Sequence, residues 1–221
     1  MRDTLMRTRL SLLLLLLALS VGAFGADPKL EKVTRPAQSP VPDTIWQVVD
    51  PEGFRVDLDD GPLCEIWLRK SVPVSSAKGN EEALFAQFAP STMLGVINFL
   101  KGSTDYKGDP IKPGFYTLRY ELLPADGNHM GVAPNPDFAL IMPPGSDSDP
   151  NAQLKFQDMV SLSRKATSTQ HPGPLSLVQP DKTVPGISKD DQDHWIFSAN
   201  LTLSSGSKLP IGLVIKGTAP Q

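Results

Sequence analysis

The chain has 221 residues, of which 40% are hydrophobic and 20% are charged, and its formal net charge is −3 at pH 7. This balance is typical of a globular protein with enough chain for one sizeable core. A mildly acidic chain without a basic stripe lacks the electrostatic footprint of a nucleic-acid-binding protein, and it has no polybasic patch for anionic membranes. The 22 prolines and 17 glycines favour many short strands over long helices.

The first 25 residues have the pattern of a signal peptide. Arg2, Arg7 and Arg9 form a positive region, the apolar run 10–19 follows, and small residues suited to a signal peptidase come next. The run is shorter than the ~20 residues that span a bilayer, so we expect cleavage, export to the periplasm or the extracellular space, and no membrane insertion of the mature chain. An uncleaved signal anchor is the alternative. Cleavage removes three Arg and one Asp, which changes the formal charge from −3 to −5.

The composition divides the mature chain into a tether and one domain. Residues 26–44 are polar and rich in proline, which predicts a flexible tether. A single domain is expected over residues 45–221. It begins with a hairpin whose strands, 45–49 and 54–58, flank the turn sequence Asp-Pro-Glu-Gly.

The next expected strand, residues 63–69, alternates between two faces. Cys64 falls on the apolar face, and it is the only cysteine of the chain. It therefore forms no internal disulfide, and we expect a buried, unreactive thiol. Trp67 falls on the other face with Glu65 and Arg69, which predicts an exposed ring suited to stacking on a sugar.

Residues 111–143 read as two strands joined by a long loop. In the first strand the apolar residues alternate with Thr117, Arg119 and Glu121, which predicts one face towards water. The return strand, residues 137–142, is apolar on both faces, so we expect it to lie deeper in the sheet.

The loop between these strands carries candidate ligand-binding residues. Asp126, His129 and Met130 lie in it, and a loop of this length is more often functional than idle. His194 follows an acidic run in a second loop. A His, Met and Asp set suits copper or zinc, so His129 and His194 are the predicted metal ligands if the two loops meet in space. Exposed histidines without a ligand are the alternative.

Calcium and hydrolase motifs are incomplete. Residues 190–193 (Asp-Asp-Gln-Asp) resemble part of a calcium loop but lack its glycine and its terminal glutamate, so calcium at this segment is left open as an alternative to copper or zinc. The sequence contains neither Gly-x-Ser-x-Gly nor His-Glu-x-x-His. No catalytic residue is therefore predicted.

The last third of the chain contains the one predicted helix. Asp149 followed by Pro150 suggests a helix start, which places a helix near residues 150–165. Alternating residues at 195–204 and 211–215 predict a C-terminal hairpin. The sum is a mainly β fold, an antiparallel β-sandwich of about eight to ten strands with this one helix.

Three motifs resemble a known pattern. The segments LCEIWLRKSVP (63–73), PGFYTLRY (113–120) and DGNHMG (126–131) resemble those of an uncharacterised family of exported bacterial β-rich proteins, a domain of unknown function. The resemblance covers the middle of the mature chain. It implies export and a β-rich fold. It implies no chemistry, because the family carries no established activity.

These observations favour an exported, non-catalytic binding or structural module with an unknown ligand or protein partner. The expected site is where the loop 126–137 meets the loop 190–194. A copper- or zinc-binding protein that uses His129 with Met130 or His194 is the second hypothesis, and a hydrolase on the same scaffold is the third.

Overall fold

The structure is a computed structural model. It describes residues 27–75, 82–124, 133–167 and 169–218. The expected signal peptide lies outside these residues, as do Asp126, His129 and Met130. Within the described ranges, no helix is both long and apolar enough to cross a membrane.

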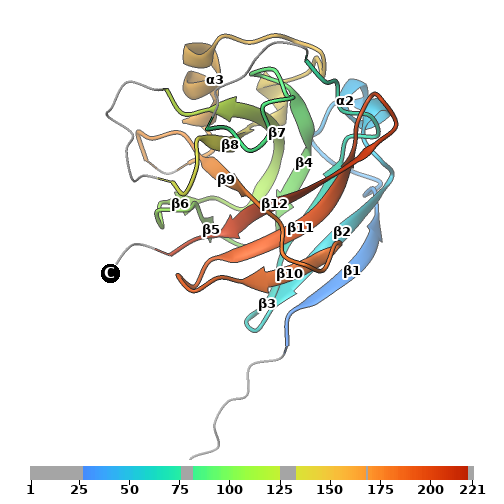
Figure 1. The fold of residues 1–221 in the computed structure, drawn as a ribbon. Helices are drawn as coiled ribbons and strands as arrows, with labels where there is room; N and C mark the ends of the chain where they lie inside the picture. The colour runs from blue at the N-terminus through green and yellow to red at the C-terminus, as the bar shows by residue number, and fades with distance from the viewer. Residues whose placement is uncertain (1–26, 76–81, 125–132, 168, 219–221) are drawn as a thin grey trace, which may run out of the picture.

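The fold is mainly β (Figure 1). The strands are β1 (Lys29–Thr34), β2 (Glu52–Leu58), β3 (Gly61–Leu68), β4 (Met93–Phe99), β5 (Ser103–Thr104), β6 (Pro110–Ile111), β7 (Gly114–Leu122), β8 (Asp137–Met142), β9 (Pro174–Val178), β10 (Gly186–Lys189), β11 (Trp195–Thr202) and β12 (Lys208–Lys216). The helices are α2 (Asp43–Val48), the 3-10 turn η1 (Pro144–Ser146) and α3 (Phe156–Ser163).

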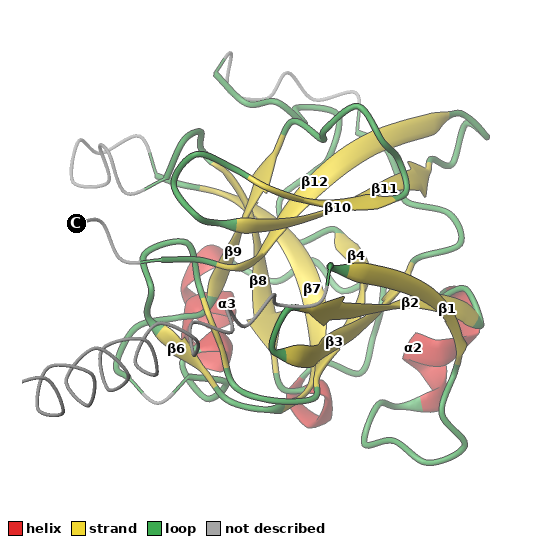
Figure 2. Ribbon diagram, turned by 90° about the horizontal axis from the view of Figure 1, so that it is seen from below, coloured by secondary structure: helices red, strands yellow, loops and turns green. Residues whose placement is uncertain are grey.

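Ten of these strands form one antiparallel sheet. Their order is β1-β2-β3-β4-β7-β8-β9-β12-β11-β10, and β5 and β6 form a separate two-stranded ribbon. The large sheet curls until its edge strands β1 and β10 come into contact, so it is nearly closed into a barrel (Figure 2). The mainly β, antiparallel prediction is confirmed. The two layers expected for a sandwich belong here to one continuous sheet.

Strand β1 corrects the prediction of a flexible tether. It pairs with β2 from Lys29 opposite Asp57 to Thr34 opposite Glu52. Its half-buried residues, which include Leu30, pack against hydrophobic clusters, while its charged residues face solvent. Charged side chains are common on edge strands, because they discourage pairing with another chain. This polar composition led to the wrong prediction.

Helix α2 replaces the strand predicted at residues 45–49. It begins after Pro42. Proline suits a helix start because its φ is already fixed near the helical value, and because the N–H that it lacks would have no partner within the helix there. Its neighbouring residues Ile45 and Trp46 are both buried. A helix that packs on a sheet can bury two adjacent residues. A sequence pattern of only five residues does not distinguish such a helix from a strand.

Helix α3 lies where the sequence predicted a helix, but it is shorter. It begins at Phe156, so the predicted start at Asp149 is wrong. The Asp149 carboxylate instead accepts the backbone N–H of Asn151 in a turn, and the Asp149 carbonyl accepts Nη2 of Arg119. These bonds hold the segment before the helix in a non-helical path.

Apolar side chains fill the interior of the barrel. The inward-facing residues include Cys64, Ile66, Leu118, Tyr120, Ile141, Leu175, Phe197 and Leu213. Cys64 is fully buried, as predicted, and burial raises the pKa of its thiol. Phe85 and Phe88 also join this cluster, and the Asp137 carboxylate accepts the Phe85 amide and the Tyr120 hydroxyl. Because side chains occupy the interior, a candidate site is expected on the outer surface.

The outer face of β7 is dry, contrary to the prediction. Thr117, Arg119 and Glu121 are 0%, 0% and 5% exposed. The chain after β8 returns across this face, where Asp147 forms a two-point ion pair with Arg119 at 2.7 and 2.9 Å. Alternation identified the two faces correctly but did not reveal the segment that covers one of them.

Candidate functional site

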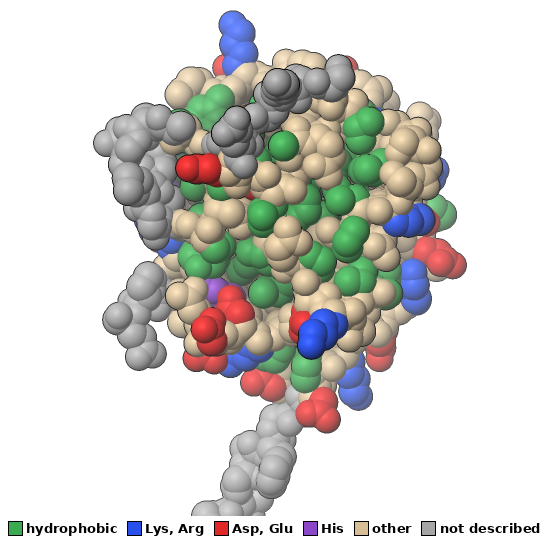
Figure 3. Space-filling model, viewed as in Figure 1, with side chains coloured by type: hydrophobic (Ala, Val, Ile, Leu, Met, Phe, Trp, Pro, Cys, Tyr) green, Lys and Arg blue, Asp and Glu red, His purple; other side chains and the backbone are tan. Residues whose placement is uncertain are grey.

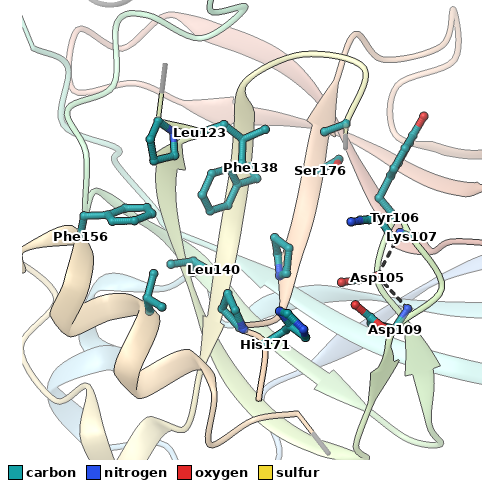
Figure 4. A pocket seen from close by; sticks show the side chains of 15 residues that line it. Asp105, Tyr106, Lys107, Asp109, Leu123, Phe138, Leu140, Phe156, His171 and Ser176 are labelled. Carbon is teal, nitrogen blue, oxygen red and sulfur yellow. Dashed lines mark hydrogen bonds between the residues drawn. The ribbon is translucent and has the colours of Figure 1, made fainter. Parts of the chain in front are cut away.

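A groove of about 190 Å³ lies on the outside of the sheet, between α3 and the connection from β5 to β6 (Figure 4). Strands β8 and β9 form its floor. It is lined by Asp105, Tyr106, Lys107, Asp109, Leu123, Pro124, Ala133, Phe138, Leu140, Phe156, Val160, His171, Pro172, Pro174 and Ser176. The face of the molecule in Figure 3 mixes hydrophobic and polar side chains, and acidic side chains lie beside a histidine at the lower left of the view.

The floor and one wall of the groove are apolar. Phe138 and Leu140 alternate with inward-facing residues of β8, so both project outward from the barrel. Phe156 and Val160 lie one helical turn apart on α3 and pack against the same cluster. The sheet and the helix therefore form an apolar corner, closed on its far side by polar residues.

The polar wall is a tight turn around Asp105. Oδ1 of Asp105 accepts the backbone N–H groups of Lys107 at 3.0 Å and Asp109 at 2.9 Å. Asp105 is only 3% exposed, and burial raises the pKa of its carboxyl to about 6. The nearby Asp109 also raises this pKa, whereas the two amide hydrogen bonds and Lys107 lower it. The wall therefore presents a carboxyl group that changes charge near neutral pH.

His194 supports this wall from behind. Its ring lies 4.2 Å from the ring of Tyr106, centroid to centroid, and Tyr106 lines the groove. Asp190 fixes His194 through both carboxylate oxygens, because Oδ1 accepts the backbone N–H at 2.9 Å and Oδ2 lies 3.0 Å from Nδ1. His194 is 3% exposed. It is a buried, paired residue rather than an exposed loop histidine.

The groove lies beside His194, and the described residues on either side of the segment 125–132 line it. Pro124 and Ala133, which flank the segment 125–132, both belong to its lining, and Tyr106 connects its opposite side to His194. The candidate residues Asp126, His129 and Met130 lie outside the described residues, so their predicted roles stay predictions.

Trp67 does not have the exposed position that was predicted. It is fully buried, because α2 covers the outer face of β3. Its ring meets Trp46 edge-on at 5.4 Å and stacks with Phe115 at 6.3 Å. A ring packed in this way offers no face to a sugar, so the stacking interpretation of Trp67 is wrong.

Two acidic side chains of the loop after β10, Asp190 and Asp193, bond to neighbouring residues of the protein. Asp190 holds His194 and the backbone N–H of Gln192, and Asp193 pairs with Lys189 at 2.7 Å. Among the described residues, no group of three or more His, Cys, Asp and Glu is placed to hold a metal ion. The predicted pairing of His194 with His129 in a copper or zinc site stays a prediction.

Sequence reasoning missed the polar wall. Asp105 and Asp109 lie in a short Asp-Tyr-Lys-Gly-Asp segment that has the composition of a turn and no periodicity. His171, for which the sequence suggested no role, is at the same end of the groove (Figure 4). The spacing of Asp105 and Asp109 suggests a turn, but the sequence alone does not bring that turn beside β8 and α3.

Comparisons of the chain with protein families, with curated proteins and with solved structures found no match.

Proposed function

We propose that this protein is an exported, non-catalytic binding protein and that its ligand occupies the groove between α3 and residues 105–109. The observation that carries the proposal is the combination of an apolar floor with a few polar groups converging from one side. Small-molecule sites have this composition, because apolar contact supplies affinity and a few polar groups fix orientation. Export rests on the pattern of residues 1–25, and the resemblance of the central motifs to exported proteins agrees with it.

The size of the groove limits the ligand. Its volume is about 190 Å³. An engineered cavity of about 150 Å³ holds benzene. Pockets for drug-sized ligands are larger, about 300–1,000 Å³. The groove therefore suits a body of one ring, or a branched aliphatic group of similar size.

A binding role fits the side chains better than a hydrolytic role. A serine, threonine or cysteine nucleophile needs a base within hydrogen-bonding distance. In the described part of the chain, the ring of His194 bonds to Asp190, and no hydroxyl or thiol side chain hydrogen-bonds to the ring of either described histidine. The groove thus offers recognition groups without an activated nucleophile.

The test introduces a large side chain on α3 that occupies the groove. Val160 lines the groove and Ser161, the next residue of α3, is exposed and does not line it. A fragment library of single-ring compounds is screened by ligand-observed NMR and thermal shift against protein expressed from the full sequence. We expect binders to the wild type and to Ser161→Trp, and loss of binding in Val160→Trp. A library without binders, or binding that survives Val160→Trp, would overturn the proposal.

A further inference from the structure

The inference concerns the chemical class of the ligand, and it rests on the proposed function. We propose that the groove binds a primary ammonium group on a compact apolar body, with the ammonium on Oδ2 of Asp105 and the body against β8 and α3.

One carboxylate oxygen of Asp105 has no partner among the described residues. Oδ1 is occupied by the amides of Lys107 and Asp109, whereas Oδ2 has no hydrogen-bond partner in the part of the chain that the structure describes. Figure 4 shows the second carboxylate oxygen of Asp105 directed away from the turn and into the groove. Asp105 as a residue is 97% buried, and its unpaired oxygen keeps its access to the groove, where a bound ligand is positioned to supply a donor in place of water.

The charges at the polar end of the groove favour a cationic ligand. This end of the groove carries the carboxylates of Asp105 and Asp109 and the ammonium of Lys107. When both carboxylates are ionised, one negative charge is in excess. Lys107 makes no ion pair within 4 Å in the described residues. An opposite charge close to a buried carboxylate favours its ionised form, so a cation beside Oδ2 relieves the cost of burying it.

A primary ammonium suits the single free oxygen of Asp105 better than other cations do. A guanidinium prefers two carboxylate oxygens at once, and Asp105 has only one free. Calcium takes six to eight oxygen ligands, which one free carboxylate oxygen beside an apolar floor does not provide. A primary ammonium needs only one strong acceptor here and uses its other donors on neighbouring oxygens or water.

The body of the ligand follows from the rest of the lining. Phe138, Leu140 and Phe156 present apolar and aromatic surface opposite Asp105 (Figure 4), and Val160 also lines the groove. A six-membered ring joined to the ammonium by a short chain places its apolar part on this surface and its charge at the carboxylate. 2-Phenylethylamine has this arrangement and is the probe for the test.

The experiment compares 2-phenylethylamine with two analogues of similar size, neutral 2-phenylethanol and anionic 3-phenylpropionate, by calorimetry at pH 8. We expect the amine to bind roughly tenfold to a hundredfold more tightly than the alcohol, as a charge-assisted hydrogen bond in a dry site provides. Asp105→Asn keeps the shape and the Oδ1 acceptor and should abolish this preference. Asp158→Asn removes an exposed carboxylate from α3 that does not line the groove, and should leave it unchanged.

The outcomes separate this inference from the proposed function. Equal binding of amine and alcohol, or tighter binding of the propionate, overturns the ammonium assignment while the groove remains a binding site. No groove binder of any kind overturns both. If Asp105→Asn fails to fold, the pH dependence of binding to the wild type provides the test. The affinity for the amine should fall from pH 7 to pH 5, while the affinity for the alcohol stays constant. An amine affinity that does not change with pH overturns the inference.

A Phe-Gly-Gly peptide distinguishes two sources of the ammonium. Binding equal to that of the amine supports the inference and identifies a peptide N-terminus as the natural group. Binding weaker than that of the amine also supports it and identifies a small free amine.

Discussion

The ion pair between Arg119 and Asp147 should be one of the main determinants of stability. The guanidinium is fully buried, and acceptors surround it: both Asp147 oxygens at 2.7 and 2.9 Å, the carbonyls of Ser91 and Asp149 at 2.6 Å, and the carbonyl of Ala152 at 2.9 Å. The substitution Asp147→Asn keeps the size of the side chain. It removes the negative charge and turns an amide N–H₂ towards the donors of Arg119 or the hydroxyl of Thr117.

The expected cost follows from what remains behind. Removal of one partner of a buried pair leaves an uncompensated buried charge, which costs about 3–5 kcal/mol. In a domain of this size 1 kcal/mol corresponds to roughly 2–4 °C in melting temperature, so Asp147→Asn should lower the midpoint by roughly 6–20 °C. Asp60 provides the matched control, because it pairs with Lys101 at 2.7 Å but is 53% exposed. Asp60→Asn should cost less than about 1 kcal/mol.

Urea denaturation of both variants and the wild type, followed by tryptophan fluorescence, measures the difference. Equal slopes in urea will show that the change lies in stability rather than in the compactness of the unfolded state. If Asp147→Asn costs no more than Asp60→Asn, Arg119 finds other compensation and the role given to the pair is wrong.

Three further predictions concern single buried groups. The pKa of Asp105 is raised from 3.8 to about 6, so the folded state binds the proton more tightly than the unfolded state. The contribution of Asp105 to the unfolding free energy should therefore fall by about 2 kcal/mol as pH rises from 4 to 6, and urea titrations of Asp105→Asn should not show this fall. Trp67→Ala should cost about 3–5 kcal/mol in urea denaturation, because the ring is fully buried, whereas an exposed sugar-stacking ring would cost almost nothing. Cys64 should resist a thiol reagent such as dithionitrobenzoate at pH 8 in the native protein and react fully in guanidinium, and rapid native labelling would contradict its burial.

Period-two alternation, together with one continuous apolar run at 137–142, was sufficient to locate most of the sheet. The return strand expected at 137–142 is β8 with those bounds, and the strand expected from residue 195 is β11. Alternation also placed Cys64 on the correct, inner face. These predictions succeed because the barrel interior is filled by the side chains of alternate residues, and the sequence records that directly.

The same reasoning failed where another segment covers the outer face. Arg119 and Trp67 lie on the polar faces of their strands and are nevertheless buried, one by the chain after β8 and the other by α2. A strand pattern distinguishes two faces, but it does not say which distant segment returns over one of them. The groove was unpredictable for the same reason, since its walls come from residues 105–109 and from α3.

The motif arginines connect the sequence pattern to the groove. Arg69 of the EIWLRK segment donates to the carbonyl of Pro150 at 3.0 Å and to Oδ1 of Asn151 at 2.7 Å, while Arg119 of PGFYTLRY holds Asp147 and Asp149. Two buried cations thus fix one short stretch of chain against the sheet.

This stretch leads directly into α3, whose Phe156 and Val160 form the apolar wall of the groove. The arginines therefore act as positioning residues for a site that they do not touch. Substitution of Arg119 should loosen α3 and weaken ligand binding even where the protein remains folded, whereas a purely local role would lower stability and leave affinity in the folded fraction unchanged. Calorimetric affinity of Arg119→Lys, measured below its melting temperature, separates the two.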